Sequence, residues 1–221
     1  MNYYKIQTRL INKVVGFTAS NHMISGYNFN DENSVYNIPP RGKIKFTPNL
    51  YGIELLKRAK LMDIIGSVPV PKAGITISNK LLQIIKKFSI PLETQIFDAT
   101  VIFNNEEYNY YYFYIYDAKE DKMVDWNQSY FIEKNFSESI GEELQTTKSA
   151  LINMQTEDFK LFEPTKLVLN SNFIQSGIFK LDHTFYGYYI TEELKNDIEK
   201  IGCIGIDFIP IDKLGFEVVI Q

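Results

Sequence analysis

Two segments of this chain, residues 76–97 and 189–208, share a pattern that predicts a strand, a capped helix and a second strand. Each has a hydroxyl residue where a helix N-cap is expected, Ser78 or Thr191. Apolar residues then recur at i, i+4 and i+7, on one helix face: Leu81, Ile85 and Phe88, or Leu194, Ile198 and Ile201. We therefore expect two similar strand-helix-strand half-units. Because many capped helices look like this, duplication and chance similarity both remain open.

Alternating residues and turn signals predict an antiparallel meander between the two segments. Its expected strands are 99–103, 108–116 and 129–133, with turns at Asn104-Asn105 and 117–122. Further strands are expected at 159–162, 166–169, 177–181, 186–190, 204–209 and 216–220. The sequence thus predicts an α+β fold, mostly antiparallel sheet with a few short helices. We expect one domain over 1–221, which can be divided into half-units 1–134 and 135–221.

The remaining segments have weaker patterns. Thr47-Pro48 and the apolar spacing after it predict a helix over 48–60, preceded by a short strand at 43–46. The prolines of 68–71 predict extended backbone. A second helix is expected over 137–154. The residues before 43 give no clear pattern.

Composition indicates a globular protein with a sizeable core, since 45% of its 221 residues are hydrophobic. No stretch of roughly 20 apolar residues could span a bilayer, and the first residues lack the apolar core of a secretory signal. We therefore expect a cytoplasmic protein. The single cysteine, Cys203, cannot form an internal disulfide, and its isoleucine neighbours predict a buried thiol.

Charge is unevenly distributed along the chain. Residues 98–158 contain thirteen Asp and Glu against four Lys and Arg. Such a region can steer a basic partner toward the protein and repel nucleic acid. The alternative interpretation is a solvated surface that serves solubility.

One predicted strand carries a row of tyrosines on a single face, Tyr110, Tyr112, Tyr114 and Tyr116. Tyrosine suits positions where one end is apolar and the other is wet, so the row is a candidate contact surface. A central strand covered on both faces would give the same pattern.

The sequence contains few residues arranged for catalysis. His22 and His183 lie far apart without cysteine or histidine at ligand spacing, so we expect no metal site, and no Gly-rich phosphate loop is present. We expect no cofactor and no enzymatic activity. The alternative is a small enzyme or ligand-binding protein with a cleft near Asp125, Trp126 and Ser129, where the aromatic neighbour could raise the pKa of the acid.

Several motifs resemble those of a bacterial immunity protein family, the eleventh among the immunity families of polymorphic toxin systems. Residues 189–195, followed by Ile198, Gly202 and 205–208, are similar to its carboxy-terminal signature. Upstream, the motifs that fit are Ala59–Ile65 ahead of Gly74–Ser78, the Tyr-rich strand, and Val124-Asp125-Trp126 with Ser129. Where the family often has valine and serine before its second helix, this chain has Ile190 and Thr191. The resemblance covers 59–209 and leaves residues 1–58 unmatched.

The resemblance implies a non-catalytic protein that binds and neutralises a cognate toxin. A basic nuclease-type toxin would suit the acidic region, and neither nucleic acid nor a membrane is expected as a partner. Composition, not the family, points to the contact residues: Tyr110, Tyr112, Tyr114, Asp117, Glu120, Asp121 and Trp126. A structural subunit of a secretion apparatus is a further alternative.

Overall fold

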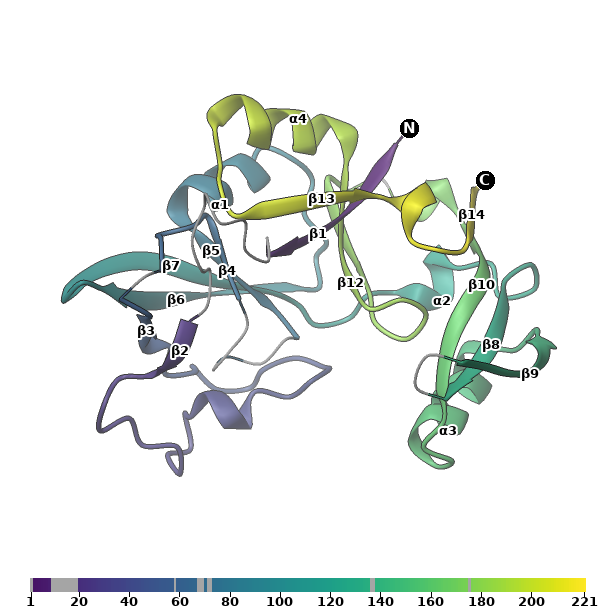
Figure 1. Ribbon diagram of the computed structural model, residues 1–221, viewed down its shortest axis with the longest axis horizontal. Helices are drawn as coiled ribbons and strands as arrows, with labels where there is room; N and C mark the ends of the chain where they lie inside the picture. The colour runs from purple at the N-terminus through teal and green to yellow at the C-terminus, as the bar shows by residue number, and fades with distance from the viewer. Residues whose placement is uncertain are drawn as a thin grey trace.

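A computed structural model describes residues 2–8, 20–57, 59–66, 70, 73–135, 138–174 and 176–221. Three sheets make up the fold (Figure 1), and we name each after one strand. The β1 sheet has the order β11 (Ile178–Leu181), β12 (Gly187–Thr191), β1 (Tyr3–Thr8) and β13 (Ile206–Pro210). The β9 sheet has the order β14 (Glu217–Ile220), β10 (Leu161–Leu169), β8 (Tyr130–Asn135) and β9 (Glu138–Leu144).

The β7 sheet is the largest. Its order is β2 (Ser20–Met23), β3 (Tyr51–Leu55), β6 (Thr94–Phe103), β7 (Glu106–Ile115), β5 (Ile75–Ser78) and β4 (Ile64–Ile65). The helices are short: α1 (Asn79–Ile85), α2 (Glu120–Met123), α3 (Lys148–Thr156) and α4 (Glu192–Ile201), with 3-10 turns η1 (Val35–Asn37), η2 (Ser171–Phe173) and η3 (Ile211–Lys213). The expected α+β class, mostly antiparallel with a few short helices, is confirmed. Two strand pairs are parallel, β3 with β6 and β10 with β14.

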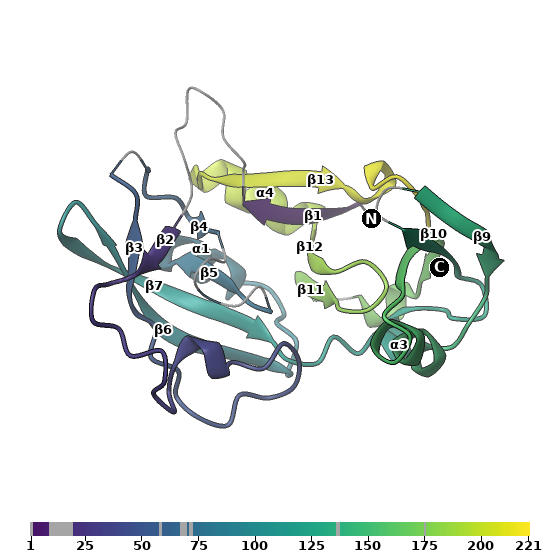
Figure 2. The ribbon, with the colours of Figure 1, turned by 60° about the horizontal axis from the view of Figure 1, so that its bottom comes forward.

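The two half-units share one topology. In the first, β5 leads through α1 to β6, and β7 lies antiparallel between these two strands. In the second, β12 leads through α4 to β13, and β1 lies antiparallel between them. Figure 2 shows β1 running between β12 and β13. The N-terminal strand therefore takes in the second half-unit the place that β7 has in the first.

Local signals account for both helices of the half-units. The Ser78 hydroxyl accepts a hydrogen bond from the Leu81 amide (3.1 Å), and the Thr191 hydroxyl accepts one from the Leu194 amide (3.4 Å). Gly202 ends α4 in the left-handed conformation, at φ 73°. Both expected caps are confirmed.

The β1 sheet lies at the centre of the molecule, because apolar clusters cover both of its faces. Ile6, Ile178 and Ile190 pack with α1 and α4 against the β7 sheet. Tyr3 and Phe179 pack against residues of α2 and the β9 sheet. These strands are rich in large apolar residues because both faces exclude water.

Five sequence expectations were wrong. The expected three-stranded meander does not form, because β8 pairs with β9 and β10 and not with β7. The segment 48–60, expected to be a helix, contains strand β3 instead, and Gly52 at φ 85° has a backbone conformation that a right-handed helix does not allow. The expected strand at 43–46 is irregular chain. The expected helix over 137–154 begins too early: its first part is strand β9, and the helix, α3, starts only at Lys148. The half-unit boundary at 134/135 falls inside β8, and β1 pairs across it with β12 and β13.

Two further expectations have a limited outcome. Of the expected extended segment 68–71, residues 68, 69 and 71 lie outside the described residues. Cys203 is only partly buried, and burial raises the pKa of its thiol to about 11. That direction favours the protonated thiol, which is the less reactive form.

Candidate interaction surface

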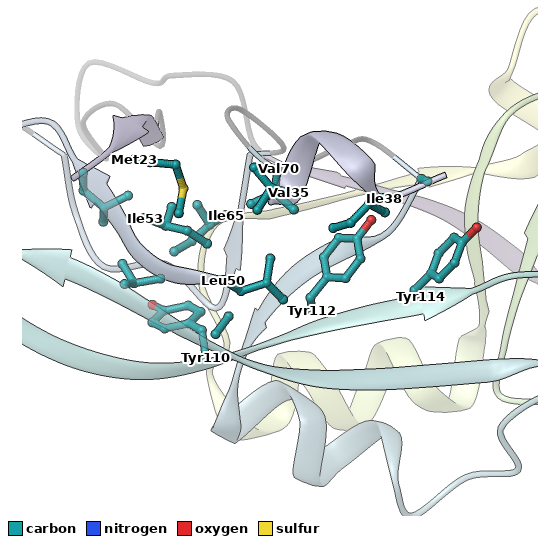
Figure 3. Close-up of a cluster of buried hydrophobic side chains, with 14 of the residues drawn as sticks. Met23, Val35, Ile38, Leu50, Ile53, Ile65, Val70, Tyr110, Tyr112 and Tyr114 are labelled. Atoms are coloured by element: carbon teal, nitrogen blue, oxygen red, sulfur yellow. The ribbon is translucent and has the colours of Figure 1, made fainter. Parts of the chain in front are cut away.

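The tyrosine row of β7 is buried. Tyr110, Tyr112 and Tyr114 are 5%, 1% and 0% exposed. Figure 3 shows the three rings rising from β7 into a cluster with Val35 and Ile38. The three residues therefore cannot form the predicted contact surface, and the alternative, a strand covered on both faces, is correct.

The tyrosine hydroxyls are used inside the protein. Tyr110 donates to the carbonyl of Met62 (2.7 Å), and Tyr114 donates to the carbonyl of Gly42 (2.8 Å). Burial raises the pKa of Tyr110 above its usual range and that of Tyr114 to about 12. These rings hold the chain around η1 and residues 39–42 onto the β7 sheet, so their role is structural.

Glu120 is also fully buried, at the start of α2. Its carboxylate accepts hydrogen bonds from the backbone amides of residues 182–184 and from the Thr184 hydroxyl (2.9 Å). Burial raises the pKa of Glu120, although the bonds to Thr184 and His183 oppose the rise. Glu120 therefore fixes the β11–β12 loop onto α2, and its prediction as a contact residue was wrong.

A buried ion pair lies beside this loop. The Lys180 ammonium is 2.7 Å from a carboxylate oxygen of Asp182 and 3.2 Å from the carbonyl oxygen of Ile115. Both side chains are at least nine-tenths buried. Desolvation lowers the pKa of Lys180, and the Asp182 charge opposes that change. Through its hydrogen bond to Ile115, the paired Lys180 joins β11 to the end of β7. The contacts between the β1 sheet and the β7 sheet are therefore partly electrostatic.

His183, in the same loop, gives a prediction for acid stability. Burial, with the charges of Arg41, Lys148 and Lys180, lowers its pKa to about 4. The unfolded chain takes up this proton near pH 6.5, so between the two values the unfolded state binds more protons. We expect the free energy of unfolding to fall as pH decreases through this window.

Urea titrations at several pH values would measure this effect. The His183→Gln variant should lose this part of the pH dependence, whereas His22→Gln, at an exposed position, should keep it. Identical pH slopes for His183→Gln and the unchanged protein would contradict the prediction.

The other predicted contact residues lie at the surface around α2. Asp117 is partly exposed, and although burial raises its pKa, the bonds and charge of Lys119 lower it overall. Asp121 is exposed and 3.6 Å from the Lys148 ammonium. Trp126 is partly buried, donating its indole N–H to the Glu120 carbonyl and stacking on Phe131. Asp117, Asp121 and Trp126 therefore remain candidates.

At the alternative site, Asp125, Trp126 and Ser129, the polar side chains form hydrogen bonds within the protein. The Ser129 hydroxyl is buried, donates to the Asp125 carbonyl (2.8 Å) and accepts from the Val168 amide (3.0 Å). The Asp125 carboxylate accepts from the Asn127 amide and from Gln128. Because the hydroxyl is inaccessible, the nucleophile or ligand contact that this alternative needs is missing at Ser129.

The acidic residues of 98–158 fall into two groups. Asp98, Glu106 and Glu107 belong to the β6–β7 hairpin, which points away from the β9 sheet (Figure 1). Residues 117–158, with ten Asp and Glu against four Lys and Arg, form α2, α3, β8 and β9, and all of these acids except Glu120 are at least partly exposed. The acidic region is therefore two separate surfaces, of which the second contains all the remaining candidates.

In the part of the chain that the structure describes, no group of three or more His, Cys, Asp or Glu could hold a metal ion. Nor does any helix among those residues have the length and apolar character needed to cross a membrane. No protein-family model and no curated protein matches the chain.

Sequence reasoning missed the charged residues around the β11–β12 loop. Lys180 interrupts the apolar run of β11, and Asp182 follows it at i+2, the spacing that places both on one side of a strand. A lysine inside such a run is a signal for a buried, paired charge. Its partner Ile115, 65 positions away, leaves no sequence signal.

Proposed function

We propose that this protein is an immunity protein, which binds a cognate secreted bacterial toxin and neutralises it by non-catalytic contact. The family resemblance over residues 59–209 motivates this function. The structural observation that carries it is the acidic end of the molecule, formed by α2, α3, β8 and β9. Binding would take place in the cytoplasm of the producing cell or its kin.

Strand β9 is the most exposed part of this acidic end. It is the edge strand of its sheet, and its first six residues are exposed, including Glu138, Glu142 and Glu143. Gly141, at φ 77°, lies where the pairing of β9 with β8 shifts register. Carboxylates and an irregular edge discourage nonspecific strand pairing, and the same carboxylates attract a basic partner.

A basic active-site cleft, such as that of a nuclease, is the partner surface that suits this end best. Complementary charge accelerates the encounter of two proteins, and the contact then blocks access of the substrate to the cleft. Nucleic acid itself would be repelled. Toxin neutralisation in this scheme requires binding alone.

Co-expression with the product of the adjacent gene, followed by size-exclusion chromatography, tests the function directly. We expect the two proteins to elute together and the growth defect caused by the toxin to disappear. Separate elution together with undiminished toxicity would reject the proposal.

Charge reversal on the acidic end should slow association. Replacing Asp121, Glu138, Glu142 and Glu143 with lysine should lower the association rate constant by roughly 10- to 100-fold at low salt. Because rim charges act mainly on encounter, the dissociation rate should change less. Stopped-flow measurements at several salt concentrations give both constants.

A control with the same kind of charge change is available elsewhere on the surface. Lysine at Glu32, Asp98, Glu193 and Asp212, all exposed and outside α2, α3, β8 and β9, changes the net charge by the same amount. This variant should associate much faster than the acidic-end variant. Equal rates for the two variants would mean that net charge, and not this surface, guides the partner.

A further inference from the structure

A small hollow opens beside the acidic end, between α2, η2 and β11. Its volume is about 190 Å³. Its apolar lining includes Ile115, Ala118, Met123, Phe173 and Phe179. Of these, Phe173 is half exposed, whereas the other four are buried. The hollow is therefore an apolar socket with one wall at the surface.

The volume and the lining fit one aromatic ring. An apolar cavity of roughly 150 Å³ can hold a benzene molecule, whereas sites for drug-sized ligands start near 300 Å³. Two phenylalanine rings offer edge or stacked contacts to a guest ring, and the Met123 sulfur adds a favourable contact with an aromatic group. An aliphatic ring of the same size would gain burial alone.

Charged side chains stand in the lining of the same hollow. The Lys119 ammonium lies 2.6 Å from Asp117 and 3.4 Å from Glu93, and all three residues line the hollow with Lys122. Ammonium groups near a ring favour aromatic guests, and the carboxylates favour a basic group next to the ring. Lys180 also lines the hollow, but its ammonium is paired with Asp182.

We propose that this hollow receives one aromatic side chain of the protein partner, with a basic residue of the partner beside Asp117 and Glu93. This inference rests on the proposed function. A side chain is the favoured source because the hollow is smaller than most metabolite sites, and because Asp117 belongs to the acidic surface. Aromatic residues in well-packed pockets are enriched among the residues that dominate binding energy at protein interfaces.

The ring-binding part is tested on the protein alone, with phenol as the probe and cyclohexanol as the matched control. We expect phenol to shift the NMR signals of the Met123 and Ala118 methyl groups, with a dissociation constant on the order of 1 mM to 10 mM. Cyclohexanol should bind at least about threefold more weakly, because it lacks the aromatic contacts. Absence of any shift with phenol, or equal binding of both probes, would overturn the inference.

The partner part is tested in the complex with the product of the adjacent gene. Ser176→Phe places a ring at the hollow, and we expect it to weaken the complex at least about 30-fold. Phe173→Ala removes the exposed wall of the hollow and should also weaken the complex. Phe159→Ala, at a phenylalanine that is 88% exposed and does not line the hollow, should change affinity less than threefold. NMR spectra of the free variants establish that each is folded.

The outcomes separate this inference from the proposed function. A complex that forms with unchanged affinity in both Ser176→Phe and Phe173→Ala would overturn the inference and leave the function intact. Phenol binding without any complex would overturn both the function and the partner as the source of the ring. In that case the ligand of the hollow would be a small aromatic molecule and not a side chain of a protein partner.

Discussion

Replacing Glu120 with alanine should lower the free energy of unfolding by about 4 kcal/mol, because several buried hydrogen-bond donors would lose their acceptor. The donors are the backbone amides of residues 182–184 and the Thr184 hydroxyl. An unsatisfied buried donor costs roughly 1–3 kcal/mol, and partial hydration of the loop would recover some of that cost. The loop between β11 and β12 should lose its protection against hydrogen exchange.

Urea unfolding can be followed by the fluorescence of Trp126, the only tryptophan of the chain, whose indole donates to the Glu120 carbonyl. Asp121→Ala is the matched control, since it removes an exposed carboxylate from the next position and should cost within about 0.5 kcal/mol. Glu120→Gln keeps one acceptor oxygen and should fall between the two. A loss below about 1 kcal/mol in Glu120→Ala would show that the loop is held by other contacts.

The tyrosine row shows how far strand patterns can be read. Alternation in the sequence correctly put Tyr110, Tyr112 and Tyr114 on one face of β7. It could not reveal that chain from about 70 residues earlier covers that face, because residues 23–46 have few regular elements and little periodicity. The side of a sheet that is buried depends on contacts distant in the chain, so the candidate surface was placed on the wrong residues.

Two of the helices predicted from a cap and an apolar stripe are present. Ser78 and Thr191 each cap a helix, and the stripe residues Ile85 and Ile198 pack in one cluster with the central sheet. The same kind of signal misled over 48–60, where Thr47-Pro48 and the spacing after it predicted a helix, but Ile53 and Leu55 are buried from strand β3. Apolar spacing over few residues does not distinguish a short strand from a helix.

The N-terminal strand is the clearest case of a feature that the sequence hides. Residues 3–8 are paired with residues more than 180 positions later, and no local pattern encodes that pairing. Tyr3 and Ile6 nevertheless belong to the two apolar clusters on opposite faces of the β1 sheet. The acidic end and the hollow are attached to one of those faces through Phe179. Their geometry therefore depends on β1.

Deleting residues 2–8 should abolish cooperative folding of the central sheet. The deletion removes the strand between β12 and β13, so β13 loses its partner strand and β12 keeps only β11, and it exposes both clusters. Burial of Tyr3 and Ile6 alone contributes about 1.5–3 kcal/mol each, and the lost sheet pairing adds to this, against a typical total of 5–15 kcal/mol. We expect the truncated protein to show no two-state urea transition and to give poorly dispersed NMR signals.

Two single substitutions on β1 test how much its buried side chains contribute to stability. Ile6→Ala should lower the free energy of unfolding by about 3 kcal/mol, because it leaves a cavity between the β1 sheet and the helices. Gln7→Ala, at the next and exposed position, should change it by less than about 0.5 kcal/mol. If the truncated protein unfolded cooperatively with the stability of the full chain, β12 and β13 would have to be held by contacts other than β1. The N-terminal strand would then be an accessory to the second half-unit and not its middle strand.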